Sequence, residues 1–264
     1  MNRQAMDDEA SVGREHGGPD VLGPIDFDFS VNANACGPCP ELIEALGRVD
    51  ASRYPEGSYL RVREAIARLH GVEAARVVIA GSGSEFIFRM TACIARDGGR
   101  IISVPRHAYG DYAAAASAWG LRVRRRGAGR SGERDGDRNG AREDEWDDEP
   151  GGEQDGDRSR DRGRDRDAAG GLDPDVDLAW ACDPSSPLGR AEPVFTHRAP
   201  IVLDAAYEPL RLSGASAWDG ARRDRAWRLY SPNKALGLPG VRGAYALAPA
   251  GSDRRVQALQ RMAP

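Results

Sequence analysis

Short runs of β-branched and other apolar residues alternate with stretches of helical spacing along most of this chain of 264 residues. Apolar and charged residues recur at helical spacing over residues 60–69, for example, and residues 112–119 are rich in alanine. The predicted strands are residues 76–80, 100–104, 121–123, 176–182, 201–203, 227–230 and 243–248. Strands that alternate with helices in this way build a largely parallel sheet with helices on its faces, so the sequence predicts an α/β fold.

Two regions depart from this alternation, and they define the expected boundaries. Residues 1–24 are small and charged, and we expect them to form a flexible leader. Residues 127–170 are almost wholly Gly, Arg, Asp and Glu, and such a segment buries too little apolar surface to offset the entropy lost on ordering. We therefore expect a disordered charged insertion there. It separates an N-terminal arm and the first part of one domain, residues 25–126, from the second part, residues 171–264.

The charge balance and the cysteine content exclude several classes of protein. The chain has 37 basic and 41 acidic residues, a formal net charge of −4, so no overall basic field favours nucleic acid or an anionic membrane as a partner. No apolar run approaches the ~20 residues that a membrane-spanning helix needs. Four cysteines in a chain of this length fit a reducing compartment better than a disulfide scaffold, so we expect a cytoplasmic location.

Polar residues follow four of the predicted strands. They are the turn at residues 81–84, then Ser186, then Asp204 with Tyr207, and finally Ser231 with Lys234. Open α/β sheets bind ligands at the carboxyl ends of their strands, so we expect these residues to share one site. The Gly-Ser-Gly-Ser turn at residues 81–84 precedes a helical stretch, and the free N–H groups of a helix N-terminus suit a phosphate.

Lys234 is the only lysine among the 37 basic residues. Arginine stays protonated at any accessible pH, whereas a lysine amine can lose its proton and attack a carbonyl carbon. Chance retention of a surface lysine is the alternative explanation. A phosphate-binding turn, the Asp204 carboxylate and this lysine together match what pyridoxal 5′-phosphate (PLP) requires as a cofactor.

The cysteines offer a competing interpretation of the N-terminal region. Cys36-Gly37-Pro38-Cys39 has the spacing of a thioredoxin-like redox motif, but no strong strand runs directly into it. Cys93 and Cys182 stand singly in the sequence, so we expect buried core thiols and no metal site.

Seven segments of the chain carry a resemblance to a known family. They are residues 30–34, 53–57, 80–85, 109–112, 182–190, 202–207, and 231–234 with 239–243. In content and order they resemble the class I/II aminotransferases of PLP fold type I, most closely the branch of histidinol-phosphate aminotransferase and threonine-phosphate decarboxylase. The resemblance implies the large domain of that fold, a mixed and mostly parallel sheet flanked by helices. Because the chain ends at Pro264, we expect the family's C-terminal small domain to be absent.

The resemblance also implies a role for each residue around the cofactor ring. Lys234 would form the Schiff base with PLP and move a proton between substrate and cofactor. Asp204 would pair with the pyridine nitrogen and keep it protonated. Tyr207 would hydrogen-bond the phenolic oxygen, and Ser186 stands where the family has an asparagine that donates to the same oxygen. Tyr109 would stack on the ring face.

The remaining implied roles concern the phosphate and the assembly. Gly83, Ser84 and Ser231 would donate hydrogen bonds to the phosphate, and Arg242 would add its fork of donors. Tyr54 would reach the phosphate bound by the neighbouring subunit, which implies a homodimer with shared sites.

The implied activity is that of a PLP-dependent aminotransferase similar to histidinol-phosphate aminotransferase. Its substrates would be an amino acid and a 2-oxo acid, as in amino-acid biosynthesis. Two alternatives remain open. The chain could resemble the threonine-phosphate decarboxylase of cobalamin biosynthesis in activity, or it could be a truncated relative that binds PLP without catalysis.

Overall fold

The computed structural model describes residues 30–126, 174–186 and 188–263. The expected leader at residues 1–24 and the expected insertion at residues 127–170 lie outside these ranges. Within these ranges, seven strands form one sheet in the order β1-β7-β6-β5-β4-β2-β3. They are β1 (Val77–Ala80), β2 (Ile101–Val104), β3 (Arg122–Arg125), β4 (Leu178–Cys182), β5 (Ile201–Asp204), β6 (Trp227–Tyr230) and β7 (Ala244–Leu247).

The sheet is mixed and mostly parallel. Neighbouring strands from β3 to β6 pair in parallel, whereas β7 is antiparallel to both β6 and β1. Each predicted strand is present, with ends that differ by a few residues from the prediction. The predicted α/β class and the mostly parallel sheet are therefore confirmed.

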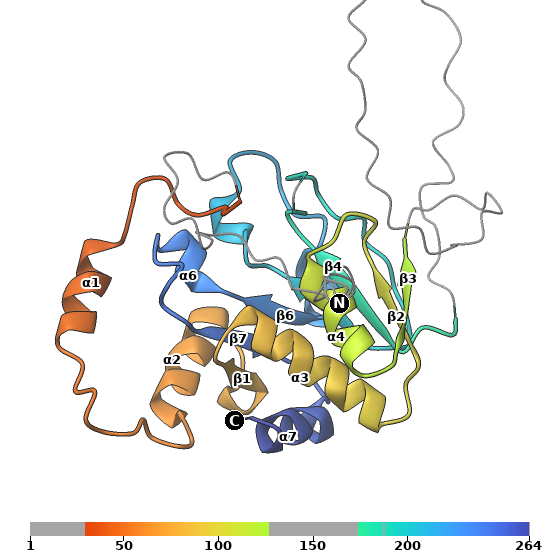
Figure 1. The fold of residues 1–264 in the computed structure, drawn as a ribbon, viewed down its shortest axis with the longest axis horizontal. Helices are drawn as coiled ribbons and strands as arrows, with labels where there is room; N and C mark the ends of the chain where they lie inside the picture. The colour runs from red at the N-terminus through yellow and green to blue at the C-terminus, as the bar shows by residue number, and fades with distance from the viewer. Residues whose placement is uncertain (1–29, 127–173, 187, 264) are drawn as a thin grey trace, which may run out of the picture.

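In the part of the chain that the structure describes, seven α-helices accompany the sheet. They are α1 (Pro40–Gly47), α2 (Leu60–His70), α3 (Gly83–Arg96), α4 (Gly110–Ala118), α5 (Gly220–Asp224), α6 (Pro232–Ala235) and α7 (Asp253–Arg261). Figure 1 shows α3 and α4 running across one face of the sheet, with α7 beside α3. Buried side chains of α3, α4 and α7, such as Phe86, Tyr112 and Leu259, form one core cluster with strand residues such as Ile102 and Leu178.

The opposite face of the sheet has its own core. There, Trp218 and Ala226 pack with Ala181 and Leu203, and the partly buried Phe195 packs against this cluster. The strands between the two clusters, β4 and β5, are buried along their whole length. Because both faces are covered, the ends of these central strands are the places where their polar residues can meet a ligand.

Helix α1 lies apart from this body at the edge of the molecule (Figure 1). None of its residues is buried, and its apolar residues Ile43 and Leu46 are exposed. In the described ranges, no helix combines the length and apolar character needed to cross a membrane.

Candidate active site

An open pocket lies where the carboxyl ends of β4, β5 and β6 meet the N-terminus of α3. It encloses about 620 Å³, including the part open to solvent. Nine of the ten predicted site residues line it: Gly83, Ser84, Tyr109, Ser186, Asp204, Tyr207, Ser231, Lys234 and Arg242. The register of the central strands explains this convergence, because Cys182 of β4 pairs with Asp204 of β5, and Asp204 pairs with Leu229 of β6.

The N-terminus of α3 forms one wall of the pocket. Ser82 precedes the helix as its N-cap, and its hydroxyl accepts a hydrogen bond of 3.0 Å from the N–H of Glu85. Gly83 opens the helix against the end of β6. A Cβ on Gly83 would lie 2.8 Å from Oγ of Ser231, so a glycine is needed for this close approach. The first N–H groups of α3 and the hydroxyls of Ser84 and Ser231 therefore border the same space.

Lys234 belongs to α6 and lines the pocket. Its Nζ donates a hydrogen bond of 2.8 Å to Oη of Tyr207 and lies 4.3 Å from the centre of that ring. The same Nζ lies 5.9 Å from the centre of the Tyr109 ring. Oη of Tyr109 is in turn 3.2 Å from Oγ of Ser84, so a hydrogen bond joins the ring wall to the start of α3.

Asp204 is the last residue of β5, and only 8% of its surface is exposed. Its Oδ1 accepts a hydrogen bond of 3.0 Å from the N–H of Ala206, and its Oδ2 accepts one of 2.7 Å from Oη of Tyr112. Burial raises the pKa of Asp204, while the two hydrogen bonds and the charge of Lys234 act in the opposite direction.

Tyr112 was not predicted as a site residue. It lies in α4, one turn beyond Tyr109, and its side chain is fully buried. Tyr112 begins the expected helical stretch at residues 112–119, and Tyr109 lies outside that stretch, so no helical spacing links the two tyrosines in the sequence. Nothing in the local sequence links Tyr112 to Asp204, which is 92 positions away.

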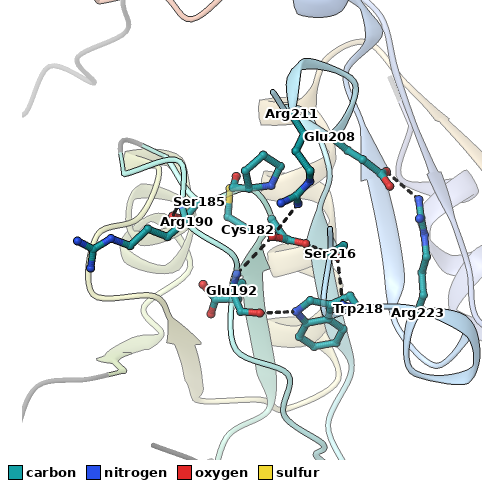
Figure 2. A network of polar contacts seen from close by, with 11 residues as sticks. Cys182, Ser185, Arg190, Glu192, Glu208, Arg211, Ser216, Trp218 and Arg223 are labelled. Atoms are coloured by element: carbon teal, nitrogen blue, oxygen red, sulfur yellow. Dashed lines mark hydrogen bonds and ion pairs between the residues drawn. The ribbon is translucent and has the colours of Figure 1, made fainter. Parts of the chain in front are cut away.

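Ser186 lies in the turn that follows β4 and lines the pocket. Figure 2 shows a network of polar contacts near the start of this turn, with Glu192, Arg211 and Ser216 among its members. Asp183 forms an ion pair with Arg211, with 2.9 Å between Oδ1 and Nη2. The Ser216 hydroxyl donates to the other oxygen of Asp183, and the N–H of Glu192 lies 3.3 Å from Oδ1. The turn carrying Ser186 is thus tied to residues that follow β5.

The N-terminal arm runs against the helix that carries Lys234. The N–H of Asn34 donates to the carbonyl of Lys234 at 3.0 Å, and the N–H of Cys39 donates to the carbonyl of Leu236 at 3.0 Å. Gly237 has a φ of 65° and faces the Gly37 carbonyl so closely that a Cβ would lie 2.2 Å from its oxygen. The Cys36–Cys39 motif therefore supports α6 through its backbone, and both thiols are free.

The structure does not bring Tyr54 to the pocket of its own chain. Tyr54 lies between α1 and α2 and is 99% exposed. The two cysteines outside the Cys36–Cys39 motif, Cys93 and Cys182, are buried as expected. Cys182 also lines the pocket. Among the described residues, no group of three or more His, Cys, Asp or Glu side chains could hold a metal ion.

Comparisons with known proteins agree with this architecture. A family model described as aminotransferase class I and II matches residues 24–133. The histidinol-phosphate aminotransferase of Rhodospirillum centenum is 33% identical over 121 residues, which cover 45% of this chain and 33% of that protein. The matching segment thus spans about a third of the length of this curated relative.

Two solved structures share the fold at low sequence identity. The L-threonine-O-3-phosphate decarboxylase of Porphyromonas gingivalis superposes with a TM-score of 0.55 at 17% identity, over 82% of this chain and 57% of that chain. The histidinol-phosphate aminotransferase of Sinorhizobium meliloti, in complex with pyridoxal-5′-phosphate, gives a TM-score of 0.56 at 15% identity, over 87% of this chain and 61% of that chain. Residues 24–133 thus match the class I and II aminotransferase family in sequence, and the fold of the described residues is shared with two enzymes that act on phosphorylated substrates by name.

Proposed function

We propose that this chain binds PLP in the pocket at the carboxyl ends of β4, β5 and β6 and acts as an aminotransferase on an amino acid and a 2-oxo acid. One observation carries the proposal. The only lysine of the chain, a buried carboxylate and a helix N-terminus flanked by serines line a single pocket. These are the three kinds of group that an aldehyde, a pyridine nitrogen and a phosphate require.

The residues present fit the cofactor at each of these three points. The start of α3 with Ser84, Ser231 and Arg242 offers N–H, hydroxyl and guanidinium donors to a phosphate dianion. Asp204, whose carboxylate borders the pocket, would stabilise a protonated ring nitrogen. A glycine at position 83, where a side chain would collide with Ser231, keeps the phosphate end open.

When bound, PLP supplies an electron sink for the bond that breaks at the substrate α-carbon. The chain's own residues would orient the reactants and move protons. Lys234 would hold the aldehyde carbon and then carry a proton at Nζ to and from the substrate. Tyr207, which accepts a hydrogen bond from that Nζ, would keep the amine in place. Tyr109 would cover one ring face and Ser186 would donate to the phenolic oxygen.

The proposed substrate and assembly rest on the family relationship. We propose histidinol phosphate, a phosphorylated amino alcohol that would take the place of the amino acid, as the amino donor to the 2-oxo acid, because this activity names the curated relative described above. We also propose a cytoplasmic homodimer in which Tyr54 contacts the phosphate bound by the neighbouring subunit. The exposure of Tyr54 leaves its side chain available for such a contact.

Two other functions use the same pocket. The resemblance in fold to the L-threonine-O-3-phosphate decarboxylase of Porphyromonas gingivalis favours decarboxylation of a phosphorylated amino acid, as in cobalamin biosynthesis, as the second candidate. Binding of PLP without turnover is the third. All three require the same contacts between Lys234, Asp204 and the cofactor.

Titration of the purified protein with PLP, followed by visible absorbance, tests the proposal. We expect the wild-type chain to give a band in the visible range that is shifted from that of free PLP, and Lys234→Ala to lose that band while keeping its fold by circular dichroism. The absence of a shifted band in the wild-type chain would contradict the proposal.

Assays of the loaded protein then separate the candidate functions. Formation of an amino acid from a 2-oxo acid with histidinol phosphate as donor supports transamination. Release of carbon dioxide from threonine phosphate supports decarboxylation instead. A loaded protein that performs neither reaction supports the interpretation of a PLP-binding relative without catalysis.

A further inference from the structure

We propose that Tyr112 is a positioning residue for Asp204, holding the carboxylate in its ionised form and in a fixed orientation toward the pocket. The effect of this contact on the pairing of Asp204 with a pyridine nitrogen rests on the proposed function. The contact itself is a property of the chain without a ligand.

The side chain of Tyr112 has little freedom to move. It is fully buried, and its ring stacks on Trp180 of β4 with 4.7 Å between ring centres and 10° between ring planes. On another side, the Tyr109 ring meets it edge to face with 5.9 Å between centres. Because aromatic neighbours fix the ring, Oη is held 2.7 Å from Oδ2 of Asp204.

The direction of this hydrogen bond follows from the electrostatics of the site. Burial and the neighbouring Asp204 raise the pKa of Tyr112 well above its usual value, so the phenol keeps its proton and donates it. Burial also raises the pKa of the Cys182 thiol, which faces the same carboxylate from β4 and stays neutral. Lys234 faces Asp204 from α6, and its charge lowers the pKa of the carboxyl group.

Each carboxylate oxygen of Asp204 accepts a hydrogen bond from a different donor. The N–H of Ala206 holds Oδ1 at 3.0 Å, and Tyr112 holds Oδ2 at 2.7 Å. A buried carboxylate is otherwise expected to take up a proton, since desolvation disfavours its charge. A neutral acid would pair poorly with a protonated ring nitrogen, so a donor that favours the ionised form supports the proposed role of Asp204.

The position of Tyr112 also couples two walls of the pocket. Tyr109 is the N-cap residue of α4, and Tyr112 lies in the first turn of the same helix. One helix therefore places both the ring wall at Tyr109 and the donor that orients Asp204. A change in the angle of α4 would move both at once.

The replacement Tyr112→Phe tests the inference first in the protein without cofactor. The pKa of Asp204 is raised in the folded state, so the folded state binds more protons and stability falls as the pH rises through that pKa. Loss of the Tyr112 donor raises this pKa further and extends the fall to higher pH. We therefore expect the loss in urea midpoint relative to wild type to be small at pH 4 and to grow toward pH 8.

The matched control is the same replacement in an Asp204→Asn background. The amide that takes the place of the carboxylate does not titrate between pH 4 and pH 8. In that background, the loss in urea midpoint caused by Tyr112→Phe should change little with pH. A loss that is the same at pH 4 and pH 8 for Tyr112→Phe overturns the inference.

Ligand binding supplies the second arm, with PLP and its 1-deaza analogue, which lacks the ring nitrogen, as probes. We expect Tyr112→Phe to weaken PLP about tenfold, the size of effect expected from a hydrogen bond to a charged group, and to change the affinity for the 1-deaza analogue far less. Equal losses for both ligands would overturn the inference. A wild-type chain that binds neither ligand would instead refute the proposed function, and the urea measurements would still decide the role of Tyr112.

Discussion

Asp183 and Arg211 illustrate how single residues hold the site in shape. The side chain of Asp183 is 1% exposed, and its ion pair with Arg211 anchors the turn that carries Ser186. The contact is an ion pair whose angle does not suit a hydrogen bond, so the Ser216 hydroxyl and the N–H of Glu192 complete the coordination of the carboxylate. Removal of one member of a buried ion pair leaves an uncompensated charge.

We expect Arg211→Met to destabilise the chain by about 3 kcal/mol, because it leaves the Asp183 carboxylate buried without a cation. Urea unfolding at neutral pH measures the effect. Asp183→Asn in the same chain should recover part of the loss, since it removes the unpaired charge while keeping the shape. Arg190→Met is the control, because Arg190 belongs to the same turn but is exposed (Figure 2). Equal losses from Arg211→Met and Arg190→Met would contradict this account of the turn.

Helix α3 shows how one element prepares the pocket for an anion. Its N-terminus carries the positive end of the helix dipole, and Ser82 and Glu85 cap the first turn. Gly83 permits the helix to start directly against Ser231. The N-terminus of α3 and the residue that follows β6, Ser231, therefore border the same part of the pocket.

Gly83→Ala should weaken PLP binding about tenfold, because its Cβ would meet Oγ of Ser231 and displace a proposed phosphate donor. A fluorescence or absorbance titration with PLP measures the change. Gly81→Ala is the matched control two residues away, since a Cβ there meets nothing within 4 Å. If the two variants bind PLP equally well, the close approach of α3 to Ser231 has no part in the site.

Much of the site follows from patterns within single elements. Asp204 and Lys234 each stand at or just after the end of an apolar strand, and a largely parallel sheet necessarily brings such ends to one edge. The contact of Tyr112 with Asp204 and the pair of Asp183 with Arg211 join separate elements. Such contacts depend on the angle of a helix or the path of a loop, which local patterns do not specify.

At the scale of the whole molecule, α1 and the segment that follows it leave apolar groups exposed. Ile43, Leu46 and Tyr54 all face solvent in the single chain. A symmetric homodimer would cover such a surface and would place Tyr54 near the pocket of the neighbouring subunit, as we propose.

Mixed subunits test this assembly. We expect Tyr54→Ala and Lys234→Ala chains to bind PLP poorly on their own. After unfolding and refolding together, a random dimer mixture should contain intact sites at roughly a quarter of the wild-type number, because each mixed dimer combines one wild-type Lys234 with one wild-type Tyr54. Titration with PLP counts these sites. No gain in the mixture over the separate variants would contradict a site shared between subunits.

The central claim is that Lys234 is the group that binds the cofactor aldehyde. Reduction of the PLP-treated protein with borohydride, followed by mass spectrometry of its peptides, tests it most directly. Because Lys234 is the only lysine, the competing amine is the α-amino group at the N-terminus. We predict that the added mass lies on the peptide that contains Lys234 and is lost in Lys234→Arg. An unmodified Lys234 peptide, with the added mass absent or confined to the N-terminal peptide, would contradict it.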